Sequence, residues 1–270
     1  VHDFVAGDYM WTGIDYLGEA NWPQRSAGCG CLDTCGFEKD AFYFYKSVWN
    51  QKEKFAYLCP HWNLKLEKGT VLPVICYTNC EDAELFVNGR SFGMKSKGFP
   101  CYGMTERYGH FDRYRRPANT DDLFLSWDVP YEPGKIEVVG YHDGKEVCRY
   151  KVETTGEAAS IKLTVDKTSV DADGRSIVQA EVRIVDSEGR LVFDACPELD
   201  FTLEGNAEII GIDNGDPACH EQWKETKGRH AFNGMAYAVI RAGQNNGELK
   251  LTVTSSDNTL TNASVTIQVG

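Results

Sequence analysis

The cysteines give this sequence its most visible capacity for chemistry, because thiolates bind metals and react with oxidants. There are ten of them in 270 residues. Cys29, Cys31 and Cys35 lie in one short segment, and Cys59 is followed closely by His61. The spacing departs from that of common zinc knuckles, and the ligands would lie on both sides of a predicted helix. We therefore expect free, mostly buried thiols that pack as small apolar side chains, and no bound metal or other cofactor.

Acidic and amide-rich segments are a second group of candidate sites. Residues 171–174 (Asp-Ala-Asp-Gly) resemble the start of a calcium loop, but the later acidic ligands and the closing Glu are absent. A turn between strands is therefore favoured. Residues 213–217 and 233–234 could line a ligand site, yet they also contain the residues that tight turns require. We favour the structural interpretation for both.

The charge balance excludes one class of partner. Lys and Arg number 28 against 40 Asp and Glu, which gives a net charge of −12. Such a surface repels phosphate backbones, so we expect no nucleic acid partner. No stretch approaches the roughly 20 apolar residues that cross a bilayer, so we expect no membrane partner. The chain begins Val1-His2-Asp3 without Met, as an excised fragment or processed product would, and the compartment stays open.

Residues 1–60 predict a different order of secondary-structure elements from the rest of the chain. Residues 4–11 predict a short, largely buried strand, and a Gly-, Cys- and Asn-rich loop follows over 18–36. Residues 38–49 predict a helix, because acids occupy the first turn and apolar residues recur with a 3.6-residue period. One strand, one loop and one helix make a βα unit, which needs neighbours to bury both faces of the strand.

From residue 61 onward the pattern is that of short strands and turns. Residues 71–78 and 83–87 are strand-like, and Asn88-Gly89 predicts a hairpin. Asp143-Gly144 predicts a second hairpin of the same kind. A linker follows near 156–159, and beyond it six alternating segments predict an immunoglobulin-like sandwich: 161–165, 179–185, 201–203, 236–241, 249–254 and 263–269. The predicted fold class is mainly β, with two β-sandwich domains.

Several motifs, in order along the chain, resemble glycoside hydrolase family 2. The segment VAGDYMWTGIDYLGE at 5–19 is similar to the last strand and following loop of that family's catalytic TIM barrel, and YFYKS at 43–47 resembles the final barrel helix. LCPHWN at 58–63 and ELFVNG at 84–89 resemble the next domain. GIDNGDP at 211–217 resembles an additional C-terminal domain. The resemblance implies a barrel remnant at 1–60, a sandwich at 61–156 and an immunoglobulin-like sandwich at 157–270.

The resemblance also implies where the chemistry lies. Family members use two glutamates, an acid/base and a nucleophile roughly 5 Å apart, on earlier barrel strands. No Glu of this chain occupies a matching position, so we expect no catalytic residue in it. Trp11 matches a tryptophan of the family's sugar-binding wall, against the alternative of a core tryptophan capping the barrel. Asp15 either holds sugar hydroxyls or braces the loop, and Trp22 either forms an outer subsite or anchors the loop.

These features predict the C-terminal accessory region of a retaining β-glycosidase, with a β-galactosidase favoured and the fragment itself inactive. Carbohydrate would be the substrate of the intact protein, and an oligomer interface stays open. The alternative is a non-catalytic carbohydrate-binding or adhesin-like module, because immunoglobulin-like folds serve both roles. For the Arg- and Tyr-rich residues 99–122 two interpretations stay open: they contact carbohydrate or the missing barrel, or they form a solvated loop. We expect the βα unit to dock on the 61–156 sandwich or on a second copy, burying Phe44, Tyr45, Val48 and Trp49.

Overall fold

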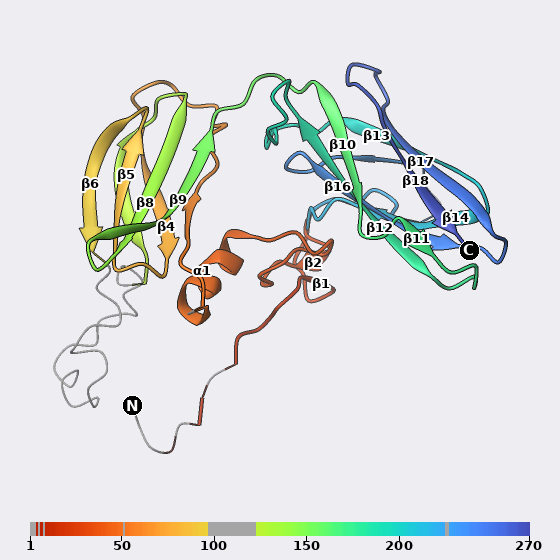
Figure 1. Cartoon of the computed structure of the whole chain (residues 1–270), viewed down its shortest axis with the longest axis horizontal. Helices are drawn as coiled ribbons and strands as arrows, with labels where there is room; N and C mark the ends of the chain where they lie inside the picture. The colour runs from red at the N-terminus through yellow and green to blue at the C-terminus, as the bar shows by residue number, and fades with distance from the viewer. Residues whose placement is uncertain (1–3, 5, 8, 51, 97–122, 225–226) are drawn as a thin grey trace. The chain divides into compact units, whose positions relative to one another are not determined.

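The computed structural model describes residues 4, 6–7, 9–50, 52–96, 123–224 and 227–270 (Figure 1). The Arg- and Tyr-rich segment 99–122, with Cys101, lies outside these residues. The chain forms two compact units, one of Val1–Gly13 with Glu38–Thr154 and one of Ile14–Phe37 with Thr155–Gly270. We call them the first and the second unit. The segment that precedes the sandwiches is therefore divided between the two units.

The first unit is a β-sandwich of two antiparallel sheets (Figure 1). One sheet has the order β3-β4-β7, with β3 at Ala56–Cys59, β4 at Val71–Thr78 and β7 at Leu125–Pro130. The other has the order β6-β5-β8-β9, with β5 at Asp82–Val87, β6 at Arg90–Ser96, β8 at Lys135–His142 and β9 at Lys145–Glu153. Burial alternates along β5, which is the period of a strand with one covered face. Val74 of the first sheet and Leu85 and Val138 of the second meet in one apolar core.

Both predicted hairpins of the first unit are confirmed. Asn88 and Gly89 have φ values of 48° and 81° between β5 and β6, and Asp143 and Gly144 have values of 49° and 71° between β8 and β9. Two successive positive φ angles match the right-handed twist of the flanking strands, and Asn, Asp and Gly adopt them most readily. These turns set the register of both hairpins.

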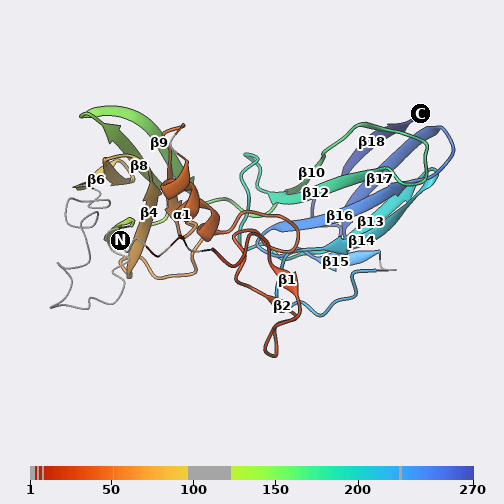
Figure 2. The ribbon, with the colours of Figure 1, turned by 90° about the horizontal axis from the view of Figure 1, so that it is seen from below.

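Helix α1, at Asp40–Trp49, packs against β4 and β3 of the first unit (Figure 2). The docking predicted for the βα unit is confirmed for the helix alone, because the strand expected at 4–11 does not form and Ile14–Phe37 belongs to the second unit. The predicted burial is only half right, because Phe44, Tyr45 and Val48 are partly covered whereas Trp49 is 65% exposed. Contacts between aromatic rings hold the helix in place of a fully buried apolar face. Among the described residues, no helix is long and apolar enough to cross a bilayer.

The predicted strand at 4–11 is wrong. None of its described residues belongs to a strand, and Phe4, Tyr9 and Trp11 are largely exposed. A barrel strand exchanges hydrogen bonds with a neighbour on each side, and it buries both faces. Within the described residues no strand pairs with this segment, so the apolar sequence alone does not make a strand.

The second unit is the predicted immunoglobulin-like sandwich. One sheet has the order β10-β12-β16-β14, with β10 at Ser160–Val165, β12 at Ile177–Val185, β14 at Ala207–Asp213 and β16 at Met235–Ala242. The other has the order β11-β18-β17-β13-β15, with β11 at Ser169–Val170, β13 at Glu198–Glu204, β15 at Gly228–His230, β17 at Gly247–Ser255 and β18 at Ala263–Val269. All six predicted strands are present, while β11, β14 and β15 were not predicted. Val182, Phe201 and Leu251 lie in the shared core.

The turn predicted at 171–174 is also present. The Asp173 carboxylate accepts the backbone N–H groups of Arg175 and Ser176, at 2.8 and 2.7 Å. These hydrogen bonds stabilise the charged form and lower the pKa of Asp173. An aspartate that caps its own turn between β11 and β12 explains this segment without a calcium ion.

Candidate functional site

The loop Ile14–Phe37, hereafter loop 14–37, is closed on itself by backbone hydrogen bonds. Strands β1 (Tyr16–Leu17) and β2 (Ser26–Ala27) pair antiparallel. The Asp15 N–H donates to Leu32 O at 2.9 Å, which ties the two ends of the loop together. A Gly- and Cys-rich sequence with little apolar content can order in this way only if its backbone groups find partners. The ribbon β1–β2 supplies part of them.

Asp15, one of the two predicted sugar-binding residues, braces this loop. Its side chain is buried, and its Oδ1 accepts the Gly30 N–H at 2.6 Å. A Cβ at Gly30 would lie 2.7 Å from the same oxygen, so only glycine allows this approach. Of the two roles that the sequence left open, the bracing role is present in the structure. The sugar-binding role stays a prediction.

An ionic cluster joins loop 14–37 to the sandwich of the second unit. Arg25 binds both oxygens of Asp213, at 2.7 and 2.9 Å, and Arg229 donates to Asp213 Oδ1 at 2.8 Å. The backbone N–H of Arg25 also donates a hydrogen bond to the backbone carbonyl of Pro217, at 2.7 Å. The Arg229 side chain is fully buried, so its charge depends on Asp213 for compensation. Both Arg25 hydrogen bonds come from Nη2, and a charged donor and acceptor make each of them stronger than a neutral hydrogen bond.

Asp33 extends the contact between the loop and the 213–217 turn. Its Oδ1 accepts the N–H groups of Cys35 and Phe37, at 2.8 and 2.9 Å. Burial raises the pKa of Asp33, the nearby Asp15 and Asp213 carboxylates raise it further, and these two N–H groups lower it. The carboxylate lies directly against Gly215, whose φ is +76°, and leaves no room for a side chain there. A turn is present at 213–217, as favoured from the sequence, and it also receives the loop.

Trp22 presents a flat aromatic surface at the tip of loop 14–37. Its ring is stacked on His220, with 4.8 Å between centroids and 28° between planes. His220 Nε2 lies 2.6 Å from Pro23 O, which holds the imidazole in place. Trp22 is nevertheless 82% exposed in this chain. An exposed indole with a supported orientation is a suitable surface for the apolar face of a sugar.

Trp11, the second predicted sugar-binding residue, belongs to the first unit. It is 72% exposed in this chain, so it does not cap an apolar core of the described residues. Its peptide bond with Thr12 is cis. The sugar-binding role of Trp11 is untested by the geometry and stays a prediction.

The cysteines that suggested zinc are divided between the units. Cys29, Cys31 and Cys35 lie in the second unit, and Cys59 and His61 lie in the first. Every cysteine in the described part of the chain is a free thiol, but only four are buried: Cys59, Cys76 and Cys80 in the first unit and Cys31 in the second. Burial raises the pKa of Cys35, and the neighbouring Asp213 and Asp33 carboxylates raise it further.

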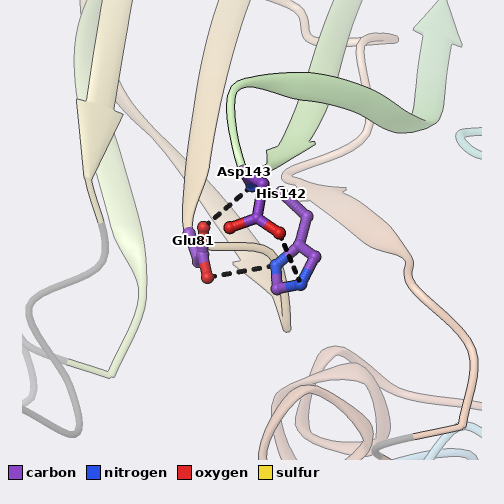
Figure 3. A group of neighbouring side chains, drawn as sticks. All are labelled: Glu81, His142 and Asp143. Atoms are coloured by element: carbon purple, nitrogen blue, oxygen red, sulfur yellow. Dashed lines mark hydrogen bonds and ion pairs between the residues drawn. The ribbon is translucent and has the colours of Figure 1, made fainter.

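A different group, Glu81, His142 and Asp143, brings three potential ligand atoms within 4.8 Å of one another (Figure 3). No sequence motif predicts this group, because Glu81 precedes β5 and the other two residues lie at the β8–β9 turn. His142 Nδ1 is 3.1 Å from Glu81 Oε1, and the Asp143 N–H donates to Glu81 Oε2 at 3.1 Å. Two carboxylates and an imidazole can bind a divalent cation. Here they are open to water and already clamp the hairpin turn to the start of β5.

Sequence reasoning missed Arg25, Asp33, Arg229 and His220 as parts of the site. Arg25 and Asp213 are 188 residues apart, so no local period connects them. The available signals were the lone arginine in a loop rich in Gly and Cys, and the two aspartates of the motif at 211–217.

Comparisons with known proteins agree with this architecture. Residues 161–266 match the model of the glycoside hydrolase family 2 C-terminal domain 5, and residues 69–148 match a domain of unknown function, DUF4982. The chain is 38% identical to the β-galactosidase BoGH2A of Bacteroides ovatus, over 94% of this chain and 27% of that protein. It is 32% identical to a putative β-glucuronidase of Formosa agariphila, over 88% of this chain and 22% of that protein.

A solved structure extends the likeness to three dimensions. A β-glycosidase from Bacteroides vulgatus superposes with a TM-score of 0.80 at 31% identity, over 95% of this chain and 30% of that one. The two sandwiches and the loop locked to the second one define an accessory β-sandwich region of the kind that glycoside hydrolases carry. The chain belongs to glycoside hydrolase family 2 and corresponds to the C-terminal region of its members. It spans about a quarter of the length of the curated relatives it matches.

Proposed function

We propose that this chain is the accessory region of a retaining β-glycosidase whose intact form hydrolyses β-galactosides. In this proposal residues 1–60 are a remnant of the last βα unit of the catalytic TIM barrel, whose strand would form only beside the other strands of the intact barrel, and residues 61–156 and 157–270 are accessory sandwiches. The observation that carries the proposal is the attachment of loop 14–37 to the second sandwich through Arg25 and Asp213. A loop that follows a barrel strand lies at the face where active sites are built. The sandwich would thus hold one wall of the active-site mouth.

The substrate class follows from the relatives and from the charges at the loop. The greater identity to a β-galactosidase supports a neutral galactoside, and the relation to a putative β-glucuronidase makes a glucuronide the competing substrate. A glucuronide carries a carboxylate, which a site recognises with a cation. Arg25 and Arg229 both form ion pairs with Asp213. Because neither arginine is left to bind a sugar carboxylate, this part of the site favours a neutral sugar.

The residues of this chain would bind and orient the sugar without performing the bond cleavage. Retaining hydrolysis needs an acid/base and a nucleophilic carboxylate across the anomeric carbon, and we assign both to the remainder of the intact protein. Trp11 would stack on the apolar face of the sugar. Asp15 would shape the site through its hold on Gly30. The proposed partner is carbohydrate, with no role for nucleic acid, membrane or cofactor.

The test of the Trp11 role is a substitution in the intact protein. Trp11→Ala should lower kcat/KM for a chromogenic β-galactoside by about tenfold or more, because a stacked aromatic ring contributes roughly 1 kcal/mol beyond its buried area. Trp49→Ala, at the exposed end of α1, is the matched control and should leave kcat/KM unchanged. Equal kinetics for the two variants would remove Trp11 from the site.

A second candidate function is carbohydrate binding without catalysis, as in an adhesin-like module. The exposed Trp22 ring supported by His220 favours it. Titration of the chain with galactose-containing oligosaccharides, followed by tryptophan fluorescence, separates the candidates. Saturable binding that Trp22→Ala abolishes, together with an intact protein inactive on every glycoside tested, would favour the binding module.

A further inference from the structure

Two cysteines of the first unit meet across a glycine. The sulfur atoms of Cys80 and Cys148 are 3.5 Å apart, although 68 residues separate them in sequence. Cys148 lies on β9 directly opposite Gly140 on β8, and Cys80 lies in the connection from β4 to β5. A Cβ at Gly140 would lie 2.6 Å from the Cys148 sulfur and 2.7 Å from the Cys80 sulfur. The missing side chain thus makes the space in which the thiols touch.

The geometry is close to that of a disulfide. A disulfide bond is about 2.05 Å long, so the sulfurs need to approach by about 1.5 Å, which small rotations of the two side chains can supply. β9 is the edge strand of its sheet, and Cys148 on it is partly exposed, whereas Cys80 is buried. A small oxidant can therefore reach Cys148, whereas Cys80 is accessible only through its contact with Cys148.

The local charges favour a reactive pair. A hydrogen bond from the Cys148 thiol lowers the pKa of Cys80 to about 6, against the effect of burial, and Thr78, Lys54 and His142 lower it further. The pKa of Cys148 is raised, first by that hydrogen bond and then by burial. One proton and one negative charge are thus shared across the contact. By contrast, burial raises the pKa of Cys59, in the same sandwich, to about 12.

We propose that Cys80 and Cys148 form a redox-active dithiol that closes to a disulfide by exchange with a small-molecule disulfide. In the first step Cys148 passes its proton to Cys80, and its thiolate attacks one sulfur of the reagent, breaking the reagent's S–S bond and releasing one thiolate. In the second step Cys80 gives its proton to the released thiolate and attacks the Cys148 sulfur, releasing the second thiolate. Two electrons pass from the cysteine sulfurs to the reagent, which leaves as one thiol and one thiolate.

The expected consequence is a clamp within the first unit. The bond would tie the edge strand β9 to the β4–β5 connection, and so close a long covalent loop within the first unit. Such a link restricts the unfolded chain and slows the separation of an edge strand. We expect the first unit to unfold at a higher temperature in the oxidised form than in the reduced form.

The experiment is to incubate the chain with oxidised glutathione, quench with acid, alkylate with N-ethylmaleimide and analyse unreduced peptides by mass spectrometry. The proposal predicts a linked peptide pair that contains Cys80 and Cys148, disappears on reduction and is about 2 Da lighter than the two reduced peptides. Exposed Cys29 and Cys196 report whether the reagent has reacted. If these two carry glutathione while Cys80 and Cys148 are each recovered alkylated or singly modified, the proposal is overturned.

Three variants sharpen the result. Cys59→Ser removes a buried thiol of the same sandwich and should leave the linked pair unchanged. Cys148→Ser should abolish it, and a persistent link from Cys80 to another cysteine would contradict the assigned pairing. Gly140→Ala should slow link formation severalfold by forcing the sulfurs apart, with circular dichroism reporting whether it folds. The linked peptide of the unsubstituted chain decides the proposal even if that variant unfolds.

Discussion

Helix α1 and loop 14–37 are neighbours in sequence, but they are attached to their sandwiches by different physics. The helix is held mainly by aromatic rings. Tyr43 stacks on Tyr57, with ring centroids 3.6 Å apart and planes 2° apart, and Phe44 contacts Tyr77 edge to face. The Tyr57 hydroxyl also donates a hydrogen bond to Asp40 at 2.8 Å. The loop is held by charge, through Arg25, Asp213 and Arg229. Aromatic contacts tolerate partial exposure, whereas buried charges do not tolerate the loss of a partner. The helix attachment should therefore weaken gradually under substitution, and the loop attachment should fail abruptly.

The largest effect is expected at the carboxylate that both arginines share. Asp213→Ala would leave the fully buried Arg229 guanidinium without a counter-charge, and we expect a loss of about 3 kcal/mol in the stability of the second unit. Loop 14–37 should lose its hydrogen-exchange protection at the same time. Urea unfolding, followed by hydrogen exchange and mass spectrometry, resolves the two units.

Glu208→Ala is the matched control for Asp213→Ala. Glu208 lies on the same strand, β14, and pairs with Arg241, but both side chains are about half exposed. An exposed ion pair contributes less than about 1 kcal/mol. If the two variants unfold at the same urea concentration, the ionic cluster does not hold the loop.

A smaller effect is expected where the loop approaches the 213–217 turn. Gly215→Ala would place a methyl group into the Asp33 carboxylate at a φ of +76°, and we expect a cost of about 2 kcal/mol. Gly189→Ala has nearly the same φ, +79°, with open space around it, and should cost only about 1 kcal/mol. The difference in unfolding free energy isolates the loop contact from backbone strain. Equal losses would mean that Asp33 moves aside freely.

The smallest effect is expected at the helix. Tyr43→Ala removes the stack on Tyr57 and should cost about 1 kcal/mol, seen as faster hydrogen exchange over Asp40–Trp49 while the sandwich strands stay protected. Trp49→Ala, at an exposed ring, should change the same rates much less. Loss of protection throughout the first unit would show that the helix is part of the core of that unit, and would contradict the local effect expected for its aromatic attachment.

The sandwiches were predictable because their signals are local. The apolar residues that recur at every second position of β5 predict a strand, and the pairs Asn88-Gly89 and Asp143-Gly144 predict hairpins. Each of these signals lies within about ten residues of sequence. Helix α1 was predictable from its period for the same reason. The short strand β15 was missed because its three residues have no period to detect.

The site was less predictable because its contacts are distant in sequence. The Cys80–Cys148 contact and the Arg25–Asp213 pair connect residues separated by 68 and 188 positions. The strand expected at 4–11 failed for a related reason, because strand formation depends on partners that the apolar pattern does not contain. Only the resemblance drew attention to Trp11 and Asp15, and for Asp15 the structure added the backbone group that it holds.

The measurement that tests the central claim most directly is hydrolysis by the chain alone. The chain and the longer protein should be assayed side by side on chromogenic β-galactoside, β-glucuronide and β-mannoside. The account predicts turnover of the β-galactoside by the longer protein and none by the chain, because in our proposal the chain contributes an aromatic wall and the remainder of the protein contributes the two catalytic carboxylates. Turnover by the chain within a few orders of magnitude of the longer protein, abolished by changing one carboxylate in this chain, would contradict it.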